Sequence, residues 1–306
     1  MGLALRHLVD PDSQPADDRL DTIMPRSGGG HKGVAVSSDD RPLKIDTSVA
    51  HPARRYDYWL GGKDNFAADR ESGDAVEAQF PTIRLGVREN RWFLCRAVDF
   101  AARQEGIRQF LDIGTGIPTS PNTHQIAQEA DRTARIVYID NDPLVLTHAR
   151  ALMTGTPQGM TRYIEADLRE PRKILEHQDL RTTLDLSKPV ALMLLAVLHF
   201  IRDAEKPRAV VDTLIDALPD GSLVIVSHAT LEHLPPEQAE ALVKADGRAL
   251  PRSGAELTAL FARPDLELVE PVKSVSQWWP EAAPEPRPAI ADVACNGLVA
   301  RVVRTT

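Results

Sequence analysis

Three aspartates each stand at the end of a short apolar run, and the first comes just before a glycine-rich turn. Asp112 lies in FLDIGTG together with Gly114 and Gly116, Asp140 ends RIVYID, and Asp167 follows RYIEA. Glycines lack a Cβ, so the backbone of such a turn can approach a ligand closely. One acid at a strand end is often only a helix cap. Three acids on consecutive strands beside a glycine turn favour a ligand-binding site.

The same residues favour a ligand with a cationic part over an anionic dinucleotide. Thr119 occupies the place of the third glycine of a Gly-x-Gly-x-x-Gly pattern, and Asp112 stands in front of the turn. A pyrophosphate needs that full pattern and a helix amino terminus without a carboxylate. S-adenosylmethionine offers an ammonium and a sulfonium, ribose hydroxyls for Asp140 and an adenine amine for Asp167. We therefore expect S-adenosylmethionine as the cofactor.

Alternating strand and helix patterns must position these acids. The apolar runs predict five strands, followed by two more, and helices are predicted between the first five and after the fifth. The strands are expected at 109–113, 135–140, 161–166, 189–195, 222–227, 266–272 and 292–303, and the helices near 122–131, 143–153, 172–178, 204–217, 236–245 and after Ser253. Right-handed crossovers then give a doubly wound α/β fold, in which ligands bind at the carboxyl ends of the strands. The fold class is a mostly parallel seven-stranded sheet with an antiparallel last strand.

Composition and charge narrow the possible partners. The net charge of −8 over 306 residues argues against a nucleic-acid partner, which usually needs a basic face. No apolar run is long enough for a membrane helix, and no secretory signal is recognised, so a cytoplasmic protein is expected. Cys95 and Cys295 are too far apart for a Cys-x-x-Cys motif, and no metal site is expected.

Three segments are expected along the chain. Residues 1–44 are rich in aspartate and glycine with almost no apolar periodicity, which predicts a disordered tail. Residues 45–106 are expected to form an N-terminal helical or lid segment, and 107–306 the S-adenosylmethionine-binding α/β domain. No internal repeat is visible, and the sequence leaves the oligomeric state open.

The stretch RRYDYWLGGKDNFAADR, residues 54–70, has two possible roles. Tyr56, with Gly61, Gly62 and Asn65, has the flat surface, backbone freedom and polar tip of a lid that closes over cofactor or substrate. Alternatively, the aromatic residues belong to a helix that packs on the core. Both alternatives remain open for Tyr58 and Trp59, whereas the lid is the favoured interpretation for Gly61, Gly62 and Asn65.

Seven ordered motifs carry a resemblance to a known family. They are RRYDYWLGGKDNFAADR, RENRWFLCRAV at 88–98, QFLDIGTGIPT at 109–119, VYIDNDPLVLTHARAL at 137–152, EADLREP at 165–171, LLAVLHFI at 194–201 and GSLVIVSHAT at 221–230. Residues 46 to about 303 thereby resemble the actinobacterial-type S-adenosylmethionine-dependent methyltransferases known as DUF574, which are class I methyltransferases with a Rossmann-like fold. One departure is Trp279, where family members commonly have arginine, so a substrate contact from that loop is not carried over.

The resemblance implies an S-adenosylmethionine-dependent methyltransferase, which we expect to act on a small molecule. It places the first acid and its glycines around the methionine end, the second acid on the ribose, the third near the adenine, and Leu195 and Ala196 under the reacting methyl. The full expected cofactor set is Tyr56, Asn65, Asp112, Gly114, Gly116, Asp140, Asn141, Asp167, Leu168, Leu195 and Ala196.

Methyl transfer needs a base only when the acceptor carries a proton and is a poor nucleophile. His199, just after the fourth strand, is the expected catalytic residue, with His228 second. His124, near the start of the first crossover helix, could face the cofactor carboxylate. Two alternatives remain: a nicotinamide-dependent oxidoreductase, and a non-catalytic S-adenosylmethionine-binding protein.

Overall fold

Five parallel strands form the half of the sheet that carries the predicted acids. In the computed structural model, which describes residues 45–152, 155–279 and 285–304, they are β1 Gln109–Ile113, β2 Arg135–Asp140, β3 Met160–Glu165, β4 Ala191–Leu195 and β5 Leu223–Ala229. Every residue of β1 and β4 is buried, as expected for parallel strands covered on both faces. The order β3-β2-β1-β4-β5 places the change in strand order between β1 and β4, where ligands bind in such sheets.

The sheet ends in antiparallel strands, so the predicted fold class is confirmed. β8, Cys295–Val302, pairs antiparallel with β5 and with β6, Leu266–Leu268. The strand predicted at 266–272 ends at Leu268, and the break that follows, 269–272, contains Pro271, which lacks an N–H to donate to a neighbour. A separate two-residue strand, β7 at Lys273–Ser274, then pairs with β8, and this gives the sheet an eighth strand.

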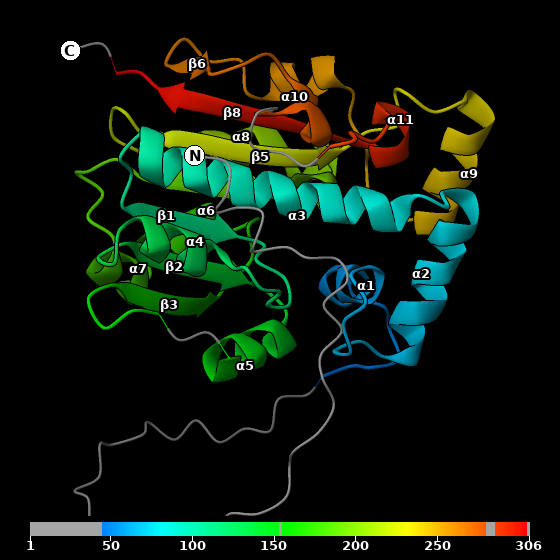
Figure 1. Ribbon diagram of the computed structural model, residues 1–306, viewed down its shortest axis with the longest axis horizontal. Helices are drawn as coiled ribbons and strands as arrows, with labels where there is room; N and C mark the ends of the chain where they lie inside the picture. Colours follow the sequence, from blue (N-terminus) through cyan, green and yellow to red (C-terminus); the bar gives the residue numbers. More distant parts are fainter. Residues whose placement is uncertain (1–44, 153–154, 280–284, 305–306) are drawn as a thin grey trace, which may run out of the picture. The chain divides into compact units, whose positions relative to one another are not determined.

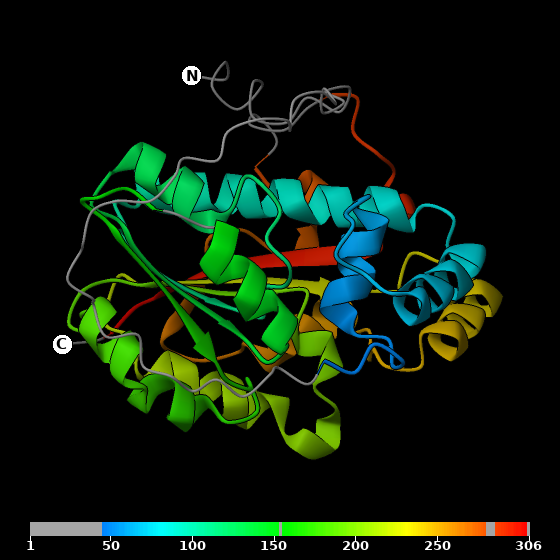
Figure 2. The ribbon, with the colours of Figure 1, turned by 90° about the horizontal axis from the view of Figure 1, so that it is seen from below.

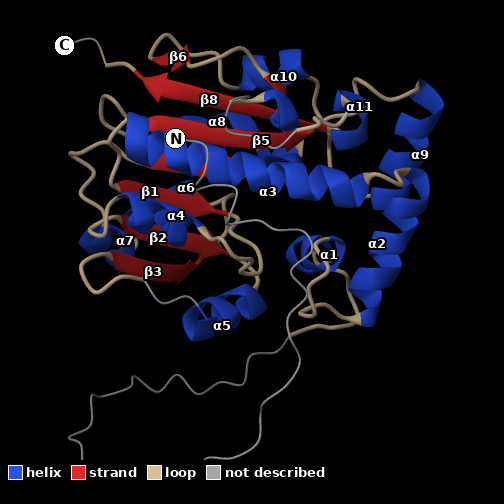
Figure 3. Cartoon of the chain, in the orientation of Figure 1, coloured by secondary structure: helices blue, strands red, loops and turns tan. Residues whose placement is uncertain are grey.

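Helices cover both faces of the sheet (Figures 2 and 3). α3, Ile83–Asp99, packs with α4, Thr123–Ala130, and α6, Pro171–Glu176, packs with α8, Pro207–Asp216. Four further α-helices are α5 Pro143–Leu152, α7 Gln178–Thr183, α10 Gly254–Leu260 and α11 Ile290–Val293. The single helix predicted at 172–178 is in fact two, because His177 has an extended backbone and caps the second one.

Three further helices gather at the carboxyl ends of the parallel strands (Figure 1). They are α1 Pro52–Trp59, α2 Ala67–Gln79 and α9 Pro236–Asp246. α2 packs against both α1 and α9, although α9 lies more than 150 residues further along the chain. These helices therefore form a wall above the end of the sheet where the predicted site lies.

The described residues from Ile45 onward belong to one compact unit. The predicted tail at 1–44 lies outside the described residues. Within the described ranges, no helix has both the length and the apolar character needed to span a bilayer.

Candidate cofactor and acceptor site

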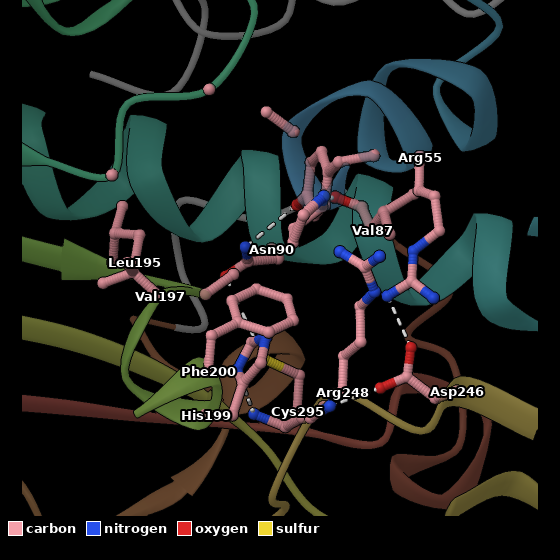
Figure 4. A pocket seen from close by; sticks show the side chains of 18 of the residues that line it. Arg55, Val87, Asn90, Leu195, Val197, His199, Phe200, Asp246, Arg248 and Cys295 are labelled. Atoms are coloured by element: carbon pink, nitrogen blue, oxygen red, sulfur yellow. Dashed lines mark hydrogen bonds and ion pairs between the residues drawn. The ribbon is translucent and has the colours of Figure 1, made fainter. Parts of the chain in front are cut away.

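A single cavity lies between the carboxyl ends of β1 to β4 and the wall of α1, α2, α3 and α9. Its volume is about 590 Å³, which is within the range of a small-molecule site. Of the expected cofactor residues, all except Asn65 line it. The cavity has two parts: the strand ends with their acids, and a more apolar part between the helices that Figure 4 shows from close by.

Asp112, the penultimate residue of β1, lines this cavity and forms no ion pair within the described residues. Its Oδ2 accepts a hydrogen bond from the Thr123 hydroxyl at 2.7 Å. Burial raises the pKa of Asp112 to about 6, although the Thr123 bond and the Arg91 charge oppose that shift. The turn that follows needs glycine: Gly114 has a φ of +76°, and a Cβ there would lie 2.6 Å from the side chain of Val197.

Asp140 ends β2 and holds the glycine turn in place. Its Oδ2 accepts from the Gly116 N–H at 2.8 Å, and its Oδ1 accepts from the Asp142 N–H at 2.9 Å. Burial raises the pKa of Asp140 to about 6 against the effect of these two N–H groups. No described cation pairs with this carboxylate, which leaves it able to accept further hydrogen bonds from a ligand.

Asp167 follows β3 at the exposed side of the cavity and is already partnered. Its carboxylate forms an ion pair with Arg169 at 3.0 Å and accepts from the Asn141 amide at 3.3 Å. Arg169 also pairs with Glu205 at 2.5 Å. Leu168, which is buried, lines the cavity beside this group. The third predicted acid is therefore neutralised by Arg169, unlike the first two.

Leu195 ends β4 and Ala196 follows it, and both line the cavity together with His199. The Nδ1 of His199 accepts from the Ala229 N–H at 3.4 Å, so its Nε2 carries the proton. Burial, together with the nearby charges of His228, Arg55 and Arg252, lowers the pKa of His199 well below its ordinary value. The imidazole is therefore neutral at pH 7.

The other two histidines considered from the sequence do not face the cavity. Both nitrogens of His228 are occupied, since Nδ1 bonds to the Ala229 carbonyl at 2.8 Å and Nε2 to Arg252 at 3.1 Å. His124 is buried against Tyr138, whose hydroxyl lies 2.9 Å from its Nδ1. Burial lowers the pKa of both histidines to about 4. Neither residue lines the cavity.

Tyr56 and Asn90 place polar groups at the wall of the cavity (Figure 4). The Tyr56 hydroxyl donates to the Val87 carbonyl at 3.0 Å and accepts from the Asn90 amide at 2.9 Å. The Cys295 thiol lies 3.9 Å from the Asn90 oxygen, and burial raises its pKa to about 12. This cysteine is therefore a protonated thiol in the wall of the cavity.

Arg54 connects helix α1 to the acid of β2. Its side chain is buried, and its Nε lies 3.1 Å from Oδ2 of Asp142, which is buried as well. The backbone N–H of Asp142 in turn donates to Asp140. The first helix of the RRYDYW stretch thus supports the turn that presents Asp140, which is a structural role.

Residues 61–66, which follow α1 and Leu60, are attached to that helix and do not line the cavity. The Asn65 amide donates to Asp57 at 2.8 Å and to the Gly62 carbonyl at 3.0 Å. A Cβ on Gly62 would lie 1.9 Å from the Asp57 carboxylate, whereas Gly61, with a φ of +82°, has open space around it. The structure therefore does not bring Asn65 to the other expected cofactor residues, because its polar tip points to Asp57. These contacts favour the fixed helix over the lid.

Replacing Asn65 by alanine is accordingly expected to lower stability and to leave cofactor affinity within about twofold of the wild type. Loss of the bond to the buried Asp57 carboxylate should cost about 1–3 kcal/mol of unfolding free energy. Urea unfolding and titration calorimetry measure the two quantities. A tenfold loss of affinity for the cofactor with unchanged stability would support the lid interpretation instead.

Several cavity residues were not anticipated from the sequence. Helix α3 presents a face of residues at helical spacing, namely Ile83, Gly86, Val87, Asn90, Arg91 and Leu94. This spacing is visible in the sequence but gives no sign that the face lines a cavity rather than the core. Trp279 lies outside the cavity, where its ring packs on Phe100 at 4.7 Å between centroids.

Comparison with known proteins relates this chain to one family by both sequence and structure. The profile of a family described as S-adenosyl methyltransferase matches residues 38–303. A search of curated proteins found no match. Among solved structures, a DUF574 family protein of Streptomyces avermitilis is 45% identical, with a TM-score of 0.80, and the match covers 85% of this chain and 100% of the other.

Two further structures are similar. A candidate methyltransferase of Thermobifida fusca YX is 36% identical with a TM-score of 0.77, over 87% of this chain and all of the other. The plantazolicin methyltransferase BamL, solved with a triazolic desmethylPZN analogue and S-adenosylhomocysteine, has a TM-score of 0.51 at 12% identity, over 82% of this chain and 96% of the other. That last likeness concerns the fold alone.

Proposed function

Because the chain belongs to the S-adenosyl methyltransferase family, it is an S-adenosylmethionine-dependent methyltransferase, and we propose that its acceptor is a small molecule bound between the β4 end and the helical wall. The observation that carries the site assignment is the pair Asp112 and Asp140. These are two buried carboxylates at adjacent strand ends, and no described cation pairs with either. The cavity of about 590 Å³ must hold both the cofactor and the acceptor, so the room that remains suits a small acceptor better than a polymer.

The residues at the strand ends fit S-adenosylmethionine. Asp112 suits the ammonium of its methionine part, and the Gly114 and Gly116 backbone leaves room for close approach. Asp140 keeps acceptor capacity for the ribose hydroxyls. The adenine end would then lie at Leu168 with Asp167 and Asn141, and the methyl end at Leu195 and Ala196.

The protein's contribution to catalysis is mainly positioning and exclusion of water. When bound, the cofactor supplies a methyl group on a sulfonium: the acceptor lone pair bonds to the carbon as the carbon–sulfur bond breaks, giving S-adenosylhomocysteine and releasing the acceptor's proton if it carries one. Orienting both reactants can contribute about 7–11 kcal/mol. His199 lines the acceptor side. Because its proton is on Nε2, its main role is to orient the acceptor by donating a hydrogen bond. Its low pKa makes it only a weak base for removing a proton from the acceptor.

Affinity for S-adenosylmethionine is expected to fall in acid. Asp112 and Asp140 have pKa values raised to about 6 in the ligand-free protein. A cation beside Asp112 and hydroxyl donors on Asp140 favour the ionised forms, so ligand binding lowers both pKa values. Above about pH 7 both carboxyls are already ionised in the free protein, so affinity for S-adenosylmethionine no longer changes with pH. Below pH 6 binding requires deprotonation, and affinity should fall by up to about tenfold per pH unit for each carboxyl.

Calorimetry between pH 5 and pH 8 measures this dependence. Asp112→Asn should remove one of the two titrating groups and flatten the profile. Affinity that rises as the pH falls would contradict the assignment.

Calorimetry with S-adenosylmethionine, S-adenosylhomocysteine and NAD tests the function itself. The first two are expected to bind and NAD is not, whereas the oxidoreductase alternative requires the reverse. Mass spectrometry of small molecules that co-purify with the protein searches for the acceptor. Cofactor binding without methyl transfer to any acceptor would favour the non-catalytic alternative. The absence of a nucleic-acid partner and the cytoplasmic location remain predictions from the sequence.

A further inference from the structure

The helical part of the cavity is lined mainly by apolar side chains. We call this part the acceptor chamber and define it by Trp59, Val76, Phe80, Val87 and Leu242, all of which are buried. They come from α1, α2, α3 and α9, and they pack together as one cluster. Such a surface favours a ring or another compact apolar group.

One cation at the edge of the acceptor chamber has no partner. Arg248 follows α9 and lines the cavity, and Figure 4 shows its side chain extending toward Asn90 and Val87. Among the residues that the structure describes, none forms an ion pair or hydrogen bond with its guanidinium. Arg248 itself is exposed, so its charge stands where the chamber meets solvent.

Two other arginines near the acceptor chamber already have hydrogen-bond or ion-pair partners. Arg55 pairs with Asp246 at 2.5 Å and bonds to the Ser72 hydroxyl at 3.2 Å. Arg91 donates to the carbonyls of Thr119 and Pro121 at 2.5 and 2.7 Å. Of these three arginines, Arg248 is the one whose guanidinium has no partner among the residues that the structure describes.

A second arginine of the cavity wall lies close to a carboxylate. Arg202 lies beside Glu205, whose carboxylate accepts the Arg202 backbone N–H at 2.7 Å. That carboxylate also pairs with Arg169. Arg202 therefore has a carboxylate close to its charge, and that charge helps to lower the pKa of Glu205.

We infer that the methyl acceptor is an apolar small molecule with a carboxylate, which Arg248 binds while the apolar part fills the acceptor chamber. The planar guanidinium binds a carboxylate with two parallel hydrogen bonds, which fixes the orientation of the molecule as well as adding affinity. A carboxylate held at Arg248 leaves the rest of the acceptor to extend toward Leu195 and His199 on the opposite side of the chamber (Figure 4). This inference rests on the proposed function, because it assumes that the cofactor occupies the strand ends.

The test uses a matched pair of probes that differ in charge, 6-hydroxy-2-naphthoate and 6-hydroxy-2-naphthamide. Both are titrated by calorimetry into the full-length protein saturated with S-adenosylhomocysteine at low salt. The carboxylate is expected to bind at least about tenfold more tightly than the amide, as for a charge-assisted hydrogen bond. In Arg248→Gln this preference should shrink to within about threefold, with unchanged affinity for S-adenosylhomocysteine.

Lys244→Gln is the matched control, because it removes one exposed positive charge from the neighbouring helix α9 at a residue that does not line the cavity. It should keep the preference for the carboxylate. Equal binding of the two probes, no binding of either at millimolar concentration, or a preference that survives in Arg248→Gln would overturn the inference. Failure of S-adenosylhomocysteine to bind the wild type would instead contradict the proposed function.

Discussion

Asp140→Ala is expected to weaken binding of S-adenosylmethionine by about 2–4 kcal/mol, roughly 30- to 1,000-fold, which calorimetry measures directly. The variant removes the carboxylate that we propose as the acceptor of the two ribose hydroxyls. It also frees the N–H groups of Gly116 and Asp142, which the carboxylate holds at 2.8 and 2.9 Å. The glycine turn would then lose part of the support that shapes it for the ligand.

Two further variants separate these effects. Asp140→Asn keeps the size and one oxygen acceptor, so its loss of affinity should be smaller. Glu165→Ala removes an exposed acid that is paired in register with Asp140 on β3 but does not line the cavity. It should bind like the wild type. Asp140→Ala with unchanged affinity would exclude the ribose assignment.

Arg54→Met is expected to lower the unfolding free energy by about 3–5 kcal/mol, because it leaves a buried carboxylate without its cation. The side chains of Arg54 and Asp142 are only 6% and 2% exposed, and their contact distance is 3.1 Å. For a domain of this size the melting temperature should fall by roughly 6–20 °C, as measured by thermal unfolding. Cofactor affinity should fall as well, since Asp142 positions Asp140 through its N–H.

The control for this variant is Arg88→Met on α3. Arg88 is exposed and does not line the cavity, so the same substitution there should change stability by less than about 0.5 kcal/mol. If Arg54→Met were equally harmless while the Gly61 and Gly62 loop were cut by protease only in the absence of ligand, α1 would be part of a moving lid. A large loss of stability supports the fixed helix.

Much of the cofactor half of the site follows from local sequence. An acid at a strand end needs only the right strand boundaries to be placed correctly, and β1, β2 and β3 end within one residue of the prediction. Parallel pairing then brings Asp112 and Asp140 to the same edge of the sheet. For the same reason the fold class could be predicted from the alternation of strands and helices.

The acceptor side could not be predicted in this way, because it depends on contacts between distant segments. Arg55 on α1 meets Asp246 at the end of α9, and no local pattern indicates that pairing. Asn65 has the features of a ligand contact in sequence, yet in the fold its nearest strong acceptor is Asp57. The direction of a side chain within a loop depends on how the neighbouring helices pack. The hydrophobic periodicity of the sequence does not describe that packing.

A crystal structure with S-adenosylhomocysteine tests the central claim most directly. We predict the ligand at the carboxyl ends of β1 to β4, with both ribose hydroxyls within hydrogen-bond distance of Asp140 and the amino group on the Asp112 side. The sulfur should face Leu195 and the helical part of the cavity. A ligand bound elsewhere, or a ribose that does not contact Asp140, would contradict the account.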